Sequence, residues 1–191
     1  MTMRILAISG SLRRDSHNTR LLRHLAEQAP PGIEIELWEG LRSIPPYDED
    51  EDREPAPAAV AELRAAIAAA DGLLFATPEY NSSVPGVLKN AIDWASRPRA
   101  STPLQGKPAA VIGATTGRFG AVWAQAELRK VLASAGARVI DRDLPLAQAH
   151  LAFDESGSLI DPGHGDRGRE VLAELAAEVE RDREAALTAA A

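Results

Sequence analysis

The sequence predicts an α/β fold in which one parallel sheet is covered by helices on both faces. Five short apolar runs alternate along the chain with segments of helical period, which is typical of parallel strands joined by right-handed crossovers. The length of 191 residues suits one domain spanning residues 1–191. The composition, 45% hydrophobic and 26% charged, is that of a globular protein with a sizeable core.

The apolar runs are the expected strands. Each is short and is bounded by Gly, Pro or polar residues, as buried strands of a parallel sheet are. Their ranges are 4–8, 33–38, 72–76, 109–113 and 138–140. Parallel strands place their carboxyl ends at one edge of the sheet. A ligand is therefore expected at the loops after the first, third and fourth strands.

Five other segments carry apolar residues at the spacing of an amphipathic helix. Helix breakers, mainly Gly and Pro, bracket each of them. The expected helices cover residues 18–29, 58–70, 86–96, 121–135 and 167–189. In the last of these, Val171, Leu175 and Val179 recur four residues apart, which indicates a helix that packs against the sheet.

Two stretches lack a regular period. Residues 39–57 hold four prolines and the acidic run 48–52, and residues 141–168 are similarly irregular. The first stretch is expected to be a long surface loop, because proline interrupts both helices and sheets. It is either a solvated connector, which we favour, or a segment that forms a subunit contact or shades one side of a ligand site.

Charge and composition exclude several classes of function. The net charge of −7 disfavours nonspecific binding of nucleic acid, which requires a basic surface. The chain has no cysteine, so disulfides and thiolate catalysis are excluded. No segment approaches the roughly 20 apolar residues of a membrane helix, and the apolar run near the N-terminus is too short for a signal peptide. A cytoplasmic protein without membrane or nucleic-acid partners is expected.

Familiar catalytic motifs are missing as well. No G-x-G-x-x-G follows a predicted strand and no G-x-x-x-x-G-K-[ST] occurs, so the dinucleotide-binding and ATPase signatures fail. The four histidines show no metal-binding spacing, and no metal site is expected. A hydrolase nucleophile motif, G-x-S-x-G, is also lacking.

The segment after the first predicted strand reads GSLRRDSHN, from Gly10 to Asn18, and leads into a helix. Ser11, Ser16 and Asn18 offer short polar side chains, Arg13 offers a planar fork, and the helix offers its first N–H groups. Taken alone, Ser16 or Asn18 is an ordinary helix N-cap. The joint occurrence of these groups, with Arg13 in a turn, favours a phosphate site. The ligand is expected to be a mononucleotide.

Two further loops leave the same edge of the predicted sheet. The loop after the third strand is either a simple turn or a segment whose backbone groups hydrogen-bond a flat heterocycle, with its tyrosine as an aromatic wall. Its candidate residues are Pro78, Glu79, Tyr80 and Asn81. The loop after the fourth strand reads as an ordinary strand-to-helix turn, and only its position indicates a ligand. Its candidate residues are Thr115, Thr116 and Gly117.

The stretches GSLRRDSHN and PEYNSSVPGVLKNAIDW together resemble the NADPH-dependent FMN reductase family, which includes quinone and chromate reductases. The resemblance covers most of the first 135 residues. It implies a flavodoxin-like domain with strand order 2-1-3-4-5 that binds FMN without a covalent link. The residues that would hold the FMN phosphate are Ser11, Arg13, Ser16 and Asn18. Residues 78–81 would contact the isoalloxazine edge, and residues 115–117 would lie under the other side of the ring.

The chain departs from the family pattern at two places. His17 stands where relatives commonly carry an apolar residue, which makes it a further candidate at the phosphate loop. The loop at residues 115–117 often reads Ser-Pro-Gly in relatives, whereas its first two residues here are Thr115 and Thr116. Neither departure removes a key side chain.

The resemblance also implies the chemistry. NADPH or NADH gives hydride to FMN and leaves, and a small acceptor such as a quinone, a flavin, an azo compound or a metal oxyanion then takes the electrons. The cofactor carries this reaction, so no catalytic acid or base is expected. Relatives form dimers or dimers of dimers, which implies a homodimer or homotetramer. Tyr47, Trp94 and the 39–57 loop are candidate contacts.

Two alternatives remain. A flavodoxin-type FMN electron carrier would exchange single electrons with proteins without turning over NAD(P)H. The sequence signature of such a carrier is a T-x-T-G-x-T phosphate loop and aromatic residues that flank the ring. Neither is clear in this chain, of which aromatic residues make up 4%. A nonenzymatic regulator that kept the fold is disfavoured by the intact phosphate loop.

Overall fold

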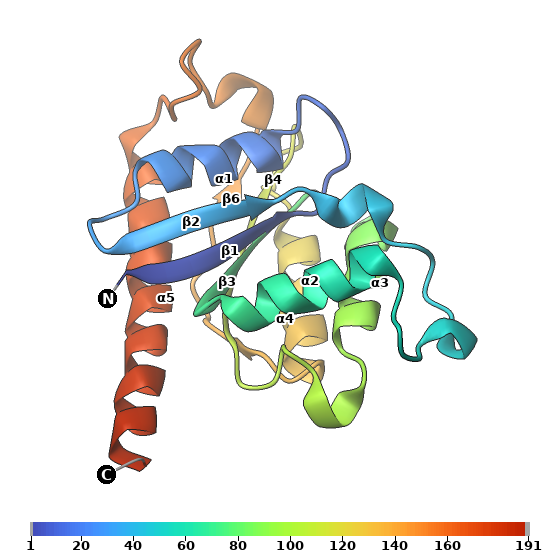
Figure 1. Ribbon diagram of the computed structural model, residues 1–191. Coiled ribbons are helices and arrows are strands. Elements are labelled where there is room, and N and C mark those ends of the chain that lie inside the picture. Colours follow the sequence, from blue (N-terminus) through green and yellow to red (C-terminus); the bar gives the residue numbers. More distant parts are fainter. Residues whose placement is uncertain (1, 190–191) are drawn as a thin grey trace.

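The computed structural model describes residues 2–189 and contains a six-stranded parallel sheet (Figure 1). The strand order is β2-β1-β3-β4-β5, and a short β6 also pairs with β4. The strands are β1 (Met3–Ser9), β2 (Ile33–Trp38), β3 (Gly72–Thr77), β4 (Pro108–Ala114), β5 (Arg138–Val139) and β6 (Pro145–Leu146).

The helices follow the strands in the alternation that the sequence predicts. They are α1 (His17–Glu27), α2 (Ala58–Ala69), α3 (Gly86–Ala95), α4 (Val122–Ser134) and α5 (Pro162–Ala189). Single 3₁₀ turns occur at Gly40–Ser43, Glu49–Glu51, Arg99–Ser101 and Ala149–Leu151. Within residues 2–189, none of these helices combines the length and apolar character needed to cross a membrane.

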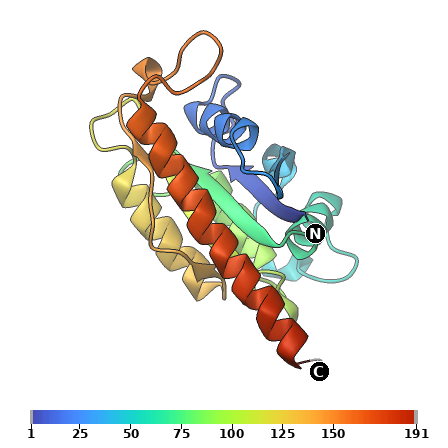
Figure 2. The same cartoon turned by 90° about the vertical axis from the view of Figure 1, so that its left-hand side faces the viewer.

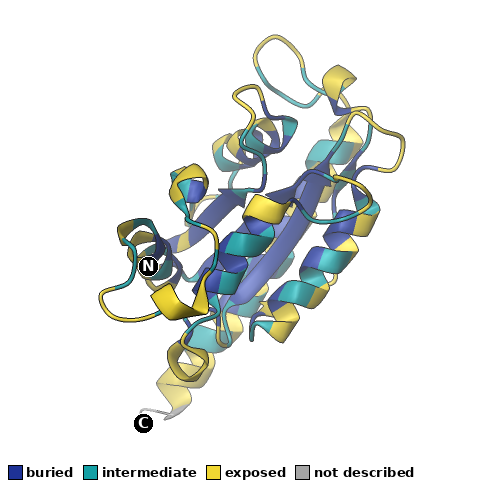
Figure 3. Ribbon diagram, turned by 90° about the vertical axis from the view of Figure 1, so that its right-hand side faces the viewer, coloured by how far each residue is buried: buried dark blue, intermediate teal, exposed yellow. Residues whose placement is uncertain are grey.

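The sheet separates two hydrophobic cores. α1 and α5 cover one face, and α2, α3 and α4 cover the other (Figures 2 and 3). Successive residues of β1 alternate between the faces: Ile5 and Ala7 belong to the first core, and Leu6 and Ile8 to the second. β3 and β4 are buried along their whole length. Burial on both faces explains why these strands read as continuous apolar runs.

The predicted fold class, the strand order 2-1-3-4-5 and the helices on both faces are confirmed. Residues 141–168 are more regular than expected, because they contain β6, a 3₁₀ turn and the start of α5 at Pro162 rather than at residue 167. A two-residue strand carries no periodic signal, and three glycines hide the start of α5 because glycine is a poor helix former. Packing requires one of them: a Cβ on Gly168 would lie 2.5 Å from Leu25 Cδ2.

Two short strands share the outer edge of β4. β5 pairs with the start of β4, at Ala109 and Val139, and β6 pairs with its end, at Gly113 and Pro145. β6 thereby returns the chain to the carboxyl edge of the sheet. There the backbone of Gly120, with φ at +61°, comes so close that a Cβ would lie 2.4 Å from the carbonyl carbon of Pro145. Only glycine fits this approach.

The 39–57 loop is fastened to α3. Pro45 O accepts hydrogen bonds from Asn90 Nδ2 at 2.7 Å and from Trp94 Nε1 at 2.9 Å. The ring of Tyr47 meets that of Trp94 edge-on, with 5.0 Å between centroids. Pro45 and Tyr47 therefore pack against α3, whereas most of the other residues of the loop are exposed, as in a surface connector. The expected subunit contact through Trp94 is wrong, because this side chain is fully buried in the chain's own core.

Candidate functional site

Three loops meet at the carboxyl edge of the sheet. They cover residues 10–16, 78–85 and 115–121, and they follow β1, β3 and β4, which are neighbours in the sheet. The register pairs Ser9 with Ala76 and Thr77 with Gly113, so the three strands end nearly level. Every predicted site residue lies on one of these loops or at the start of α1.

The first loop ends in a capped helix. Ser16 is the N-cap of α1: its backbone is extended, and its Oγ accepts a hydrogen bond from the Thr19 N–H at 3.2 Å. The N–H groups of His17 and Asn18, the first two residues of α1, have no partners within the helix. Together with the helix dipole, they make this end of α1 favourable for an anion.

Arg13 closes the same loop on itself. Its Nε donates to Asp15 O at 3.1 Å, and its Nη2 donates to the same oxygen. Its backbone N–H donates to Ser11 Oγ at 3.3 Å. These bonds orient an exposed guanidinium that still has further N–H donors to offer an anion.

His17 contributes an imidazole in cationic surroundings. Its Nδ1 is buried and has no hydrogen-bond partner among residues 2–189. Burial lowers the pKa of His17, and the positive charges of Arg13, Arg20 and His150 lower it further. A bound anion would relieve this repulsion. An orphaned nitrogen, a helix N-terminus and nearby arginines form a donor set that suits a phosphate monoester.

Asn18 ties the first loop to the third. Its side chain is buried, its Nδ2 donates to Ala114 O at 2.9 Å, and its Oδ1 accepts from the Ala114 N–H at 2.9 Å. Both ends of the amide are therefore occupied by the end of β4. The side chain of Asn18 positions the two loops relative to each other, and its backbone N–H is the group left to face a ligand.

The second loop is a tight β-turn. The N–H groups of Tyr80 and Ser83 each donate to the other residue's carbonyl at 3.1 Å. The two residues between them, Asn81 and Ser82, have φ of 52° and 60°, which is the geometry of a type I′ turn. Pro78 is buried below the turn, whereas the Tyr80 side chain is 54% exposed at the edge. The segment can therefore be both a turn and a border of a ligand site, because the turn leaves the tyrosine side chain exposed.

Glu79 joins the second loop to α4. Its Oε2 accepts hydrogen bonds from the N–H groups of Trp123 at 3.0 Å and Ala124 at 3.1 Å. These are the first-turn donors of α4, which has no side-chain cap of its own at Ala121. A carboxylate is favoured there by the helix dipole. The position of Glu79 is therefore fixed by a helix, and the side chain holds the loop in place.

The third loop rests on residues 146–149. The Thr115 N–H donates to Leu146 O at 3.0 Å, and the Gln148 N–H donates to Gly117 O at 3.0 Å. Within the loop, Thr115 Oγ1 accepts from the Gly117 N–H at 3.3 Å. Thr116 and Gly117 are exposed above this support.

Two features of the edge were not predicted from the sequence. The support from residues 146–149 is made by backbone groups, which no side-chain pattern marks. Gln125 of α4 is fully buried, with its Nε2 donating to Gly120 O at 2.8 Å and its Oε1 unpartnered in the described part of the chain. The one available signal was a polar residue among the buried positions of α4, beside Ala124 and Leu128.

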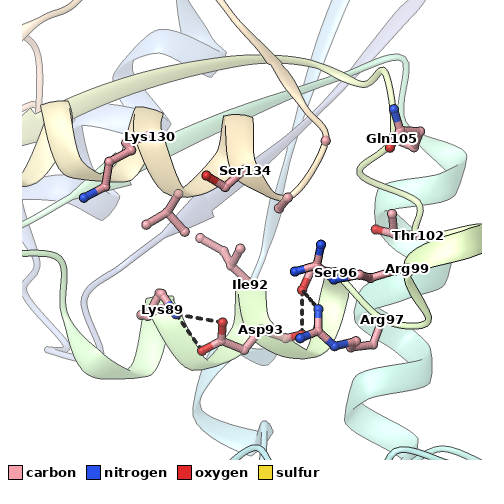
Figure 4. Close-up of a pocket in the computed structure, with 13 residues that line it drawn as sticks. Lys89, Ile92, Asp93, Ser96, Arg97, Arg99, Thr102, Gln105, Lys130 and Ser134 are labelled. Atoms are coloured by element: carbon pink, nitrogen blue, oxygen red, sulfur yellow. Dashed lines mark hydrogen bonds and ion pairs between the residues drawn. The ribbon is translucent and has the colours of Figure 1, made fainter.

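Hollows flank the first loop on both sides. One of about 180 Å³ lies toward the end of β2, and one of about 270 Å³ lies between the loop, α1 and residues 155–157. Arg14 and Arg23 line both of them. Another hollow of about 270 Å³ lies between α3 and α4 (Figure 4), and it is lined by none of the predicted site residues. The candidate site therefore depends on the three loops and not on the α3–α4 hollow.

Known proteins share this sequence and architecture. An NAD(P)H-dependent FMN reductase of Pseudomonas aeruginosa is 46% identical over 171 residues, which cover 89% of each chain. A 2-hydroxy-1,4-benzoquinone reductase of a Burkholderia species is 45% identical over 133 residues, 70% of this chain and 72% of its own. A solved flavoenzyme of Paracoccus denitrificans, an NAD(P)H:(acceptor) oxidoreductase, matches with a TM-score of 0.83 and 34% identity, covering 94% of this chain and 98% of that one.

Residues 3–151 match the model of the NADPH-dependent FMN reductase family. The chain belongs to this family. The matched range contains all three loops of the candidate site, and α5 lies beyond it. The resemblance drawn from the first two loop motifs is thereby confirmed. FMN, the cofactor named in this family, carries a phosphate monoester.

Proposed function

We propose that this chain is an FMN-dependent NAD(P)H oxidoreductase that reduces a quinone-like or other small electron acceptor. The observation that carries the proposal is the meeting of a capped helix N-terminus, a rigid type I′ turn and a supported small loop at one sheet edge. When bound, FMN accepts hydride from a reduced nicotinamide and passes electrons on. The chain therefore needs no acid or base of its own at the site.

The first loop binds the FMN phosphate in this proposal. The N–H groups of His17 and Asn18 and the guanidinium of Arg13 are its main donors, and the Ser11 hydroxyl adds another. Ser16 contributes by capping α1, which fixes the direction of those N–H groups. Support comes from the cationic surroundings of His17 and from the orientation of Arg13 by Asp15 O.

The second and third loops border the ring. In this proposal, N–H groups of these loops that have no partner in the described chain, such as that of Thr116, stabilise negative charge that develops on a reduced flavin. Glu79 holds the second loop to α4, and Tyr80 forms a side wall. The residues assigned to the ring are Pro78, Glu79, Tyr80, Asn81, Thr115, Thr116 and Gly117.

A quinone-type acceptor is supported by relatives that are named quinone reductases, including one from Escherichia coli that is 40% identical over 141 residues. Free flavins, azo compounds and metal oxyanions belong to the same proposal. Several residues assigned to the ring are exposed, so differently shaped acceptors can approach it. NADPH or NADH serves as the donor. The proposal also places the protein in the cytoplasm, where these reductants are supplied.

The proposal includes a homodimer or homotetramer. Large apolar side chains are exposed close to the site, among them Tyr80 at 54%, Phe119 at 58% and Trp123 at 49%. The rings of Phe119 and Trp123 meet edge-on with 5.0 Å between centroids. Adjacent exposed aromatic side chains such as Phe119 and Trp123 are typical of interfaces.

The visible spectrum of the FMN-loaded protein tests the enzymatic proposal. NADPH is added without oxygen, and a quinone follows. The expected result is rapid bleaching of the flavin bands, with recovery on addition of the quinone. If NADPH does not bleach the bound flavin, the result would favour a flavodoxin-type electron carrier over a reductase. A protein that retains no FMN would contradict the assigned site.

A further inference from the structure

The hollow between the first loop and the end of β2 is strongly basic. It has a volume of about 180 Å³, and it is enclosed by the loop after β1, by α1 and by the 3₁₀ turn that follows β2 (Figure 1). Four positive side chains face one negative side chain there, in a chain whose net charge is −7. A concentration of arginine in an acidic chain indicates an anion site. The ionised lining residues are Arg13, Arg14, Arg23, Arg42 and Glu39.

The one acid of this hollow does not neutralise it. Glu39 Oε1 lies 3.5 Å from Arg23 Nη2, and both side chains are more than half exposed, so this pair is weak. Arg14 and Arg42 are exposed and form no ion pair within residues 2–189. Two arginines of the hollow are therefore available to an anion, besides Arg13, which is assigned to the FMN phosphate.

The first loop itself orients Arg42. The Nη2 of this residue donates to Leu12 O at 2.7 Å, across 30 residues of sequence. Its remaining N–H groups have no hydrogen-bond partner in the described residues. Arg14 lies two residues after Leu12 and lines the same hollow. The two guanidinium groups thus approach the hollow from separate segments, which suits a phosphate because its oxygens accept hydrogen bonds from several sides.

The rest of the lining combines hydroxyl groups with aromatic surface. Thr19 Oγ1 donates to Ser9 Oγ at 2.8 Å, and the Ser11 N–H donates to the same oxygen at 3.4 Å. Trp38 packs so closely on Gly40 that a Cβ there would lie 2.4 Å from Trp38 Cζ2. Pockets for whole small molecules have volumes of about 300–1,000 Å³. The smaller hollow therefore suits one end of a larger ligand, such as a phosphorylated ribose.

The hollow lies within reach of a reductant bound at the loops assigned to the flavin ring. β2 and β4 are three positions apart in the sheet, and the register aligns Trp38 of β2 with Val111 of β4 through β1 and β3. Neighbouring strands are about 4.8 Å apart, so these two strands are separated by about 14 Å. In a nicotinamide dinucleotide, the nicotinamide and the adenosine form opposite ends. A nicotinamide above β3 and β4 therefore allows the adenosine to extend to β2.

We propose that this hollow binds the 2′-phosphate of NADPH through Arg14 and Arg42, and that the chain consequently prefers NADPH to NADH. This inference rests on the proposed function and names the group that selects its reductant. NADH lacks the 2′-phosphate and is otherwise identical to NADPH. A contact with this phosphate therefore acts on the choice between the two donors and leaves the hydride transfer itself to the cofactor.

Nucleotide fragments test the site without hydride transfer. Isothermal titration calorimetry on the FMN-loaded protein compares adenosine 2′,5′-bisphosphate with adenosine 5′-monophosphate. The bisphosphate should bind about 10- to 150-fold more tightly, as expected for charge-assisted hydrogen bonds. Arg14→Gln combined with Arg42→Gln should remove this difference. Arg53→Gln, which changes an exposed arginine of the 39–57 loop outside the hollow, is the matched control and should keep it.

Steady-state kinetics give a second measurement. In the wild type, kcat/KM should be higher for NADPH than for NADH by a similar factor. The double variant should lose this preference through a higher KM for NADPH. Its Kd for FMN should stay at the wild-type value, because neither side chain is assigned to the FMN phosphate. Circular dichroism melts compare the folding of the variants with that of the wild type.

Three outcomes would overturn the proposal: equal binding of the two nucleotides by the wild type, a difference between them that survives in the double variant, or an equal loss of NADPH and NADH turnover in that variant. Inorganic phosphate is a further probe. If it binds to the wild type and not to the double variant, while the two nucleotides bind equally, the hollow is a general anion site and the assignment to NADPH is wrong.

Failure of the proposed function is distinguishable from failure of this inference. Bound FMN that neither NADPH nor NADH bleaches would contradict the reductase. Bound FMN that both donors bleach equally well would leave the reductase intact and contradict the 2′-phosphate site.

Discussion

Individual side chains at the carboxyl edge of the sheet divide into those that hold the protein together and those that remain available to a ligand. The side chains of Ser16, Asn18 and Glu79 form hydrogen bonds with backbone groups of the protein itself. Arg13 keeps unused donors at the loop surface, and the buried Nδ1 of His17 has no partner in the described residues. Binding energy for an anion should therefore come from Arg13 and from the N–H groups of α1, and not from the Asn18 amide.

Replacing Arg13 with alanine should weaken FMN binding. The loss of charge-assisted hydrogen bonds is worth about 1.5–3 kcal/mol, which is roughly a 10- to 150-fold rise in Kd. Quenching of flavin fluorescence measures the change. Riboflavin, which lacks the phosphate, is the control, and its weaker binding should not respond to the substitution. An equal loss for both ligands would contradict a phosphate contact at Arg13.

Secondary-structure elements far apart in the sequence are joined at the site by single polar side chains. Asn18 links α1 to the end of β4, and Glu79 links the loop after β3 to the start of α4. A similar amide, Asn90 of α3, accepts from the Tyr47 N–H at 2.7 Å and donates to Pro45 O, away from the site. The two asparagines offer a matched comparison of stability with function.

Asn18→Leu should lower the free energy of unfolding by about 2–5 kcal/mol, because two buried backbone groups of Ala114 lose their partners. It should also weaken FMN binding, since the first and third loops are no longer held together. Asn90→Leu should lower stability in the same way and leave the Kd for FMN unchanged. Urea denaturation and flavin titration measure the two effects. Equal weakening of FMN binding by both substitutions would contradict a positioning role specific to Asn18.

At the scale of the whole molecule, stability should depend on pH through His24. This side chain is buried between α1 and neighbouring segments, and its Nδ1 has no partner in the described chain. Burial lowers the pKa of His24 below the ordinary 6.5, and Arg169 lowers it further, against opposing effects of Glu27 and Asp154. Below pH 6.5 the unfolded state then binds more protons at this position than the folded state does.

The contribution of His24 to stability is therefore full above pH 6.5 and is lost as the pH falls below that value toward its folded pKa. His24→Gln should flatten the profile of unfolding free energy across this range. Urea denaturation at several pH values compares the variant with the wild type. Parallel profiles for the two proteins would show that His24 does not titrate with a lowered pKa.

The sequence predicted most of the architecture because the alternation of apolar runs and helical segments is a local signal. It missed β6, whose two residues are too short for any period, and the start of α5, where glycines interrupt the pattern. It also did not show how the 39–57 loop is attached to α3. The hydrogen bonds from Asn90 and Trp94 to Pro45 span 45 and 49 residues, and no local pattern reports them.

The sequence by itself determined the fold class, the strand order implied by the family, the family itself and the edge of the sheet where the candidate site lies. It did so because strand and helix periods and the Gly10–Asn18 and Pro78–Trp94 motifs are written in consecutive residues. The tertiary structure alone decided which polar groups are occupied, as at Asn18, and which side chains join distant segments, as at Glu79. Hydrogen bonds and charge pairs join residues that folding brings together, so their partners appear only when the chain is folded.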